Sequence, residues 1–157
     1  MAVVIKEGNV FDSDADIICH QVNCQGVMGS GVAKEVRERY PAVYEQYRDL
    51  CERCMNDPAQ NLGVAQLVPV DEEGSRWIAN CFGQEDFGYD GKQYTSVAAL
   101  CRALSTVADV ARIGNFKVAI PYKIGYVRGG ADWETVKSII DGVFNDVDVE
   151  LWKLEGK

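Results

Sequence analysis

The segment IICHQVNCQGVMGSGVAKEVRERY, residues 17–40, contains the strongest structural signal in the chain. It opens with an apolar run typical of a buried strand. A polar turn with His20, the only histidine, and Asn23 follows, and a Gly-Ser-Gly stretch then leads into a helix. The first N–H groups of a helix lack partners within the helix, and glycine lets a ligand approach the backbone closely. The segment therefore predicts a site for a phosphorylated small molecule.

The composition is that of an ordinary globular protein. The chain has 157 residues, of which 47% are apolar and 25% charged. This length is enough for one domain with a substantial core, so we expect a single domain over residues 1–157. No apolar run approaches the roughly 18–20 residues of a membrane span, and the N-terminus lacks a signal-peptide pattern. We expect a cytoplasmic location and no membrane partner.

The net charge of −8 argues against a nucleic acid as the main partner, because binding its phosphates requires a basic face. A small anionic ligand is compatible with this charge, since a few backbone donors can hold it locally. The sequence does not indicate an oligomeric state.

Six cysteines are present, but their spacing does not indicate disulfides or a metal centre. Cys51 and Cys54 form a CxxC with no second ligand pair at zinc-finger spacing. Cys19, Cys81 and Cys101 lie in apolar runs and are interpreted as small core residues. We expect neither a metal nor a cofactor.

Hydrophobic periodicity predicts strands that alternate with helices. An acidic turn at 71–74 separates two of the strands and predicts a hairpin, and Asp132 is the predicted N-cap of the last helix. This alternation implies an α/β fold, a three-layer α/β/α sandwich with a central mixed sheet. The expected strands are 2–5, 17–19, 64–70, 77–82, 116–121 and 147–154, and the expected helices are 32–39, 41–50, 94–113 and 133–144.

Two segments, residues 19–32 and 120–133, each run from a strand through a glycine-bearing loop into a helix. In an open α/β sheet, ligands bind beyond the carboxyl ends of strands, where such loops meet. We therefore expect the two loops to face one pocket.

These blocks resemble the macro domain family. The first part of the resemblance lies in residues 8–10 (GNV), 15–23 (ADIICHQVN) and 29–33 (GSGVA). Residues 120–125 (IPYKIG) and 129–133 (GGADW) are similar to the second phosphate loop of that family. The resemblance covers essentially the whole chain and implies a macro domain fold that binds ADP-ribose or a related nucleotide. It is greatest with the branch of ADP-ribose 1″-phosphate phosphatases and of hydrolases that remove ADP-ribose from acidic side chains or nucleobases.

The resemblance also assigns roles to residues. Asn9 and Val10 would lie at the adenine end, and Asn23 would hold the distal ribose hydroxyls. Phe82 and Phe87 would wall the ribose or adenine pocket. Two loops would hold the diphosphate from opposite sides, one with Gly29, Ser30, Gly31 and Val32, the other with Ile124, Gly125, Tyr126, Val127 and Arg128.

Some positions depart from the family pattern. Val127 stands where the second loop usually has glycine, which restricts the backbone. Arg128 either pairs with phosphate through its guanidinium or points into water. The deglycosylating members use a lysine and an aspartate at positions that correspond to Gln84 and Gly129, and neither residue can act as a nucleophile or general base.

His20 fits the phosphatase branch. A histidine with an ordinary pKa near 6.5 serves as general acid or base near neutral pH. It would activate a water while Asn23 and the loop amides stabilise the developing charge, and Asp132 is the other family-matched ionisable group. Each has a plainer interpretation: a hydrogen-bonded structural histidine, a turn-forming asparagine and a helix cap.

Three functions therefore stand as hypotheses. The first is a phosphatase that hydrolyses ADP-ribose 1″-phosphate to ADP-ribose and phosphate. The second is a non-catalytic module that binds ADP-ribose or a related nucleotide. The third is a hydrolase that removes ADP-ribose from a macromolecule, which Gln84 and Gly129 disfavour.

Overall fold

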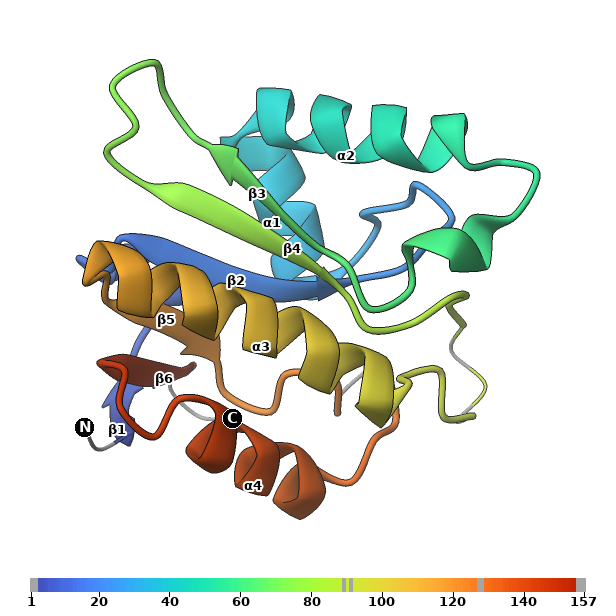
Figure 1. Cartoon of the computed structure of the whole chain (residues 1–157). Coiled ribbons are helices and arrows are strands. Elements are labelled where there is room, and N and C mark those ends of the chain that lie inside the picture. The colour runs from blue at the N-terminus through green and yellow to red at the C-terminus, as the bar shows by residue number, and fades with distance from the viewer. Residues whose placement is uncertain (1–2, 89, 91, 127–128, 155–157) are drawn as a thin grey trace.

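The computed structural model describes residues 3–88, 90, 92–126 and 129–154 (Figure 1). Within these ranges, six strands form one sheet in the order β1-β6-β5-β2-β4-β3. All neighbouring strands are parallel except β3 and β4, which form the predicted antiparallel hairpin. The strands are β1 (Val3–Glu7), β2 (Ile17–Val22), β3 (Ala65–Pro69), β4 (Trp77–Phe82), β5 (Val118–Pro121) and β6 (Val149–Lys153).

Helices cover both faces of the sheet, as Figure 1 shows. One face carries α1 (Gly31–Arg39) and α2 (Pro41–Arg53), and the other carries α3 (Val97–Gly114) and α4 (Trp133–Val143). Short 3-10 helices occupy Val10–Asp12 and Pro58–Asn61. The expected three-layer α/β/α sandwich with a mixed sheet is therefore confirmed.

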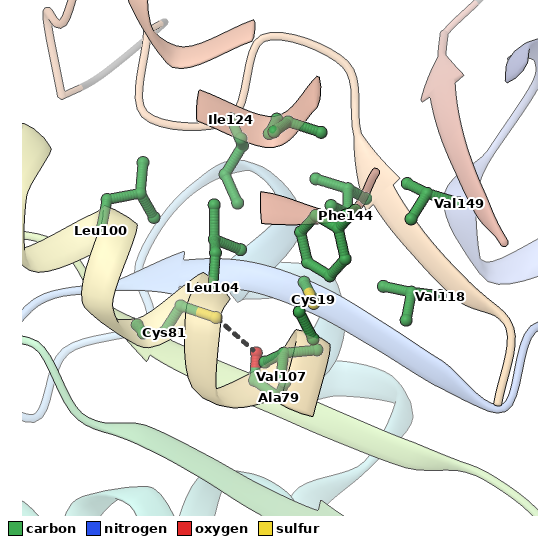
Figure 2. Packing of buried hydrophobic residues seen from close by; sticks show 14 of the residues in the cluster. Cys19, Ala79, Cys81, Leu100, Leu104, Val107, Val118, Ile124, Phe144 and Val149 are labelled. Carbon is green, nitrogen blue, oxygen red and sulfur yellow. Dashed lines mark hydrogen bonds between the residues drawn. The ribbon is translucent and has the colours of Figure 1, made fainter. Parts of the chain in front are cut away.

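Alternation of side chains along β2 divides the core into two parts. Ile17 and Cys19 point toward α3 and α4, whereas Ile18 and Val22 point toward α1 and α2. Figure 2 shows the first part, where Leu104 and Phe144 meet over the strands. The sheet is thus buried on both faces, and its polar strand residues need partners inside the protein.

All six cysteines are free. Cys19 and Cys81 are fully buried among apolar side chains (Figure 2). The neighbouring Cys81 thiol, together with burial, raises the pKa of Cys19. Cys101 is only half-buried, because it lies toward the outer side of α3. In the described part of the chain, no helix has the length and apolar character needed to cross a membrane.

Candidate functional site

A cavity of about 550 Å³ opens at the carboxyl ends of the parallel strands. The loops after β1, β2, β4 and β5 and the end of β6 all contribute to its wall. Both glycine-bearing loops line it, so the expectation that they face one pocket is confirmed. The volume lies within the range of small-molecule sites.

The first loop delivers the start of α1 to the cavity. Ser30, Gly31, Val32 and Ala33 all line it. Gly31 has φ +60°, a left-handed conformation that glycine adopts without strain. The Ser30 side chain makes no capping hydrogen bond, and the first turn contains no acidic residue. The first N–H groups of α1 and its positive dipole end are therefore available to an anion.

Asn23 organises this loop. Its Oδ1 accepts hydrogen bonds from the Gln25 N–H at 2.9 Å and the Tyr47 hydroxyl at 2.9 Å. Its Nδ2 donates to the Val27 carbonyl at 2.8 Å. Asn23 thus is the turn-forming residue of the plainer interpretation, and it also lines the cavity. Its contact with a ligand stays a prediction.

His20 lines the cavity and has one ring nitrogen without a partner among the described residues. It comes from β2, lines the cavity and is only 1% exposed. Its Nε2 lies 2.6 Å from Asn80 Oδ1, whereas Nδ1 is buried without a partner among the described residues. Burial lowers the pKa of His20 to about 4, so the ring is neutral near pH 7. A neutral imidazole can accept a proton but has no imidazolium proton to donate. The ring therefore suits the role of a general base better than that of a general acid.

The second loop contributes Ile124 and Gly125 to the cavity, but Tyr126 is not among the lining residues. Val127 and Arg128 lie outside the described residues. Lys123 and Lys153 also line the cavity, and no ion pair of either is found within the described ranges. These two lysines add positive charge to the site. Sequence reasoning missed them, although Lys123 stands in the strand-to-glycine segment that it had singled out.

At the opposite end, Asn9 and Val10 line the cavity as expected, beside Glu35 and Trp152. Asn9 Nδ2 donates to Glu35 Oε2 at 2.9 Å. The indole N–H of Trp152 donates to Glu150 at 2.9 Å. The Trp152 indole ring and the Glu35 carboxylate, which both line the cavity, suit a nucleobase. A nucleobase offers a flat face to the ring and N–H donors to the carboxylate. Neither Glu35 nor Trp152 was identified from the sequence.

The two positions at which the sequence departs from the pattern of the deglycosylating members, Gln84 and Gly129, carry no charged side chain. Gln21 Nε2 donates to Gln84 Oε1 at 2.6 Å and to Thr95 Oγ1 at 2.8 Å. A Cβ on Gly129 would collide with Thr95 Oγ1 and lie 2.6 Å from the Gly125 carbonyl oxygen, so an aspartate would not fit there. Gln84 and Gly129 both line the cavity, and neither brings a charge to it.

Two predicted site residues lie elsewhere. Phe82 is fully buried, with its ring 5.7 Å from that of Tyr47, and does not line the cavity. Its position in β4 turns the Phe82 side chain toward α1 and α2. Phe87 does line the cavity. Asp132 caps α4, where Oδ2 accepts from the N–H and hydroxyl of Thr135 at 3.1 and 2.8 Å. Asp132 is absent from the cavity wall, so the capping interpretation holds and the catalytic one has no support.

No family model matches the chain. Among curated proteins, it is 26% identical over 160 aligned positions to a DNA ADP-ribosyl glycohydrolase of Mycobacterium tuberculosis, covering 98% of this chain and 43% of the relative. It is 27% identical over 145 positions to an ADP-ribose 1″-phosphate phosphatase of Scheffersomyces stipitis, covering 82% and 83%. Among solved structures, the macrodomain of Mycobacterium tuberculosis DarG is 26% identical, with a TM-score of 0.80 and coverage of 96% and 97%.

The chain has the fold of macro domains and is similar to them in sequence. A macrodomain protein of Streptomyces coelicolor is similar as well, with 25% identity, a TM-score of 0.76 and coverage of 96% and 98%. The chain spans less than half the length of the glycohydrolases that it matches.

Proposed function

We propose that this macro domain binds ADP-ribose and hydrolyses ADP-ribose 1″-phosphate to ADP-ribose and phosphate. The observation that carries the proposal is that a neutral His20, whose Nδ1 has no partner among the described residues, lines the same cavity as the uncapped start of α1. One group accepts a proton and the other binds an anion. The Scheffersomyces stipitis relative, 83% of which is covered by this chain, is named an ADP-ribose 1″-phosphate phosphatase, and this name supports the proposal.

The ligand would span the cavity from end to end. The adenine would lie between Trp152 and Asn9, and the diphosphate between the start of α1 and the second loop. Lys123 and Lys153 would add charge attraction to the backbone donors on the second side. The distal ribose would then reach Asn23 and His20.

The reaction requires one water molecule. Its oxygen would form a new bond to phosphorus while its proton passes to His20 Nδ1. The bond from phosphorus to the 1″ oxygen would break, and the electron pair would go to that oxygen. The 1″ oxygen takes a proton through solvent, and His20 loses the one that it accepted. The N–H groups at the start of α1 would stabilise the charge that builds up on the phosphate.

A second candidate is removal of ADP-ribose from DNA, because the match to the DNA ADP-ribosyl glycohydrolases covers 98% of this chain. The neutral Gln84 and the side-chain-free Gly129 oppose it, since they offer no nucleophile or base. A third candidate is a module that binds ADP-ribose without chemistry, in which His20 accepts only a hydrogen bond from the ligand.

Calorimetric titration with ADP-ribose, together with phosphate release from ADP-ribose 1″-phosphate, tests the proposal. We expect wild type to bind and to release phosphate, and His20→Ala to lose release by about 10²–10⁴-fold, as expected for removal of a general base. Asp132→Asn serves as the control and should keep full activity, because Asp132 lies outside the cavity wall.

Each hypothesis predicts a different pattern. Tight binding without phosphate release by wild type would leave the non-catalytic module. Equal release by wild type and His20→Ala would remove His20 as the base. Release of ADP-ribose from modified DNA by wild type would favour the glycohydrolase.

A further inference from the structure

We propose that Asn80 and Gln66 are positioning residues that hold His20 in a single neutral tautomer, with the proton on Nε2 and a bare Nδ1 facing the cavity. The bare nitrogen is then a dedicated acceptor for a water or a ligand hydroxyl. This deepens the proposed function, since it assigns the base its protonation state, and its kinetic part rests on that function.

Strand register brings the three side chains into one row. His20 of β2 pairs with Asn80 of β4, and Asn80 pairs with Gln66 of β3. Paired residues of neighbouring strands point to the same face of a sheet. This row lies on the face covered by α1 and α2, and it runs from the cavity to the outer strand.

The backbone at the far end of the row fixes the direction of every hydrogen bond. The Gln46 carbonyl in α2 can only accept, so Gln66 must direct its NH₂ group there, at 3.1 Å. Gln66 Oε1 then faces Asn80 and accepts from Asn80 Nδ2 at 3.1 Å. Asn80 Oδ1 consequently faces His20, and it can only accept. Nε2, 2.6 Å away, must therefore carry the proton.

A reversed row is unfavourable. It would place the Oε1 of Gln66 against the Gln46 carbonyl, two acceptors without a hydrogen between them. Turning Asn80 over alone would set its Oδ1 against Gln66 Oε1, again two acceptors, and Asn80 has no exposure, so water does not relieve that mismatch. The other ring nitrogen, Nδ1, has no partner among the described residues, and His20 lines the cavity.

Nuclear magnetic resonance of the full chain labelled with ¹⁵N and ¹³C at histidine tests the proposal directly. The chain contains one histidine, so in protein without a histidine tag every ring signal belongs to His20. We expect the neutral ring near pH 7 to carry its proton on Nε2, with Nδ1 unprotonated. A dominant Nδ1–H form would overturn the proposal.

Gln66→Met tests the role of the row from a distance. Gln66 is half-buried and does not line the cavity, so the variant should fold. Asn80 is then free to turn its amide over, and we expect a mixture of the two tautomers. Gln46→Met is the matched control, because it keeps the backbone carbonyl and changes only an exposed side chain. Unchanged ring signals in Gln66→Met would overturn the role of Gln66.

The kinetic readout separates positioning from folding. Gln66→Met should lower kcat by roughly tenfold, less than the ~10⁴-fold effect of losing a tautomer-fixing aspartate in a catalytic triad, while the Kd for ADP-ribose stays unchanged. Asn80→Leu, which removes the acceptor of the Nε2 proton, should lose the single tautomer. Wild-type ring signals in a folded Asn80→Leu variant would overturn the role of Asn80. If wild type releases no phosphate, the proposed function fails, and the ring signals alone decide the tautomer proposal.

Discussion

At the scale of single residues, the cavity combines groups that local sequence reveals with groups that it cannot. His20 and Asn23 belong to a recognisable strand-to-loop segment, so their place at the site could be predicted, but His20 lies in β2 itself and not in the predicted turn, because the strand continues to Val22. The partnership of His20 with Asn80 and Gln66 depends on the register of three strands, two of which are remote in sequence. Phe82 illustrates the same limit: strand parity decides which face it takes, and a shift of one residue reverses that face.

The buried His20 makes stability depend on pH. Its pKa falls from about 6.5 in the unfolded chain to about 4 in the folded protein, because burial disfavours the charged ring. Below pH 6.5 the unfolded state binds a proton that the folded state refuses. This contribution to stability is therefore complete above about pH 6.5 and is lost as pH falls toward 4, by about 3 kcal/mol.

Urea unfolding of wild type and His20→Gln between about pH 7 and 4 measures this loss. Other carboxylates titrate in the same range in both proteins, so only the difference between the two free energies of unfolding counts. We expect wild type to lose about 3 kcal/mol more than the variant. Parallel pH profiles would show that His20 titrates normally in the folded protein.

At the scale of elements, a strand, a glycine loop and a helix start build the anion site. Their order could be read from the sequence, because apolar runs and glycines mark strand ends and loops. The roles of Lys153 and Trp152 could not, since β6 reaches the cavity only through its place between β1 and β5. The capping role of Asp132 was readable, because a cap is a local feature.

Gly31→Ala tests whether the left-handed start of α1 shapes the anion site. The variant places a Cβ on a residue with φ +60°, and we expect a loss of stability of about 1–2 kcal/mol. Gly74→Ala is the matched control, with φ +66° and equally open surroundings, in the β3–β4 turn away from the cavity. Thermal unfolding should show similar losses for both, whereas calorimetry should show weaker ADP-ribose binding only in Gly31→Ala. Equal affinities would mean that the N–H groups at the start of α1 do not hold the ligand.

At the scale of the whole molecule, the cavity and the surface differ in charge. The chain carries a net charge of −8, yet the cavity is lined by two lysines against one carboxylate, Glu35, and by a helix start. An anionic nucleotide is thus repelled at long range and attracted only near the site. Salt weakens the long-range repulsion more than the attraction at the site, because the Debye length falls from ~30 Å at 0.01 M salt to ~10 Å at 0.1 M.

Added salt should therefore speed the association of ADP-ribose with this protein, since it removes the long-range repulsion. Dissociation should become faster too, because the contacts of Lys123 and Lys153 with phosphate weaken. Stopped-flow fluorescence can follow both rates through Trp152, which lines the cavity. Lys137→Gln, which removes a charge paired with Asp141 on α4, makes the net charge more negative and leaves the cavity unchanged. It should slow association at low salt without changing dissociation, whereas Lys123→Gln should change both. An association rate that falls as salt is added would show that the local positive charge of the cavity, and not the net charge, governs the encounter.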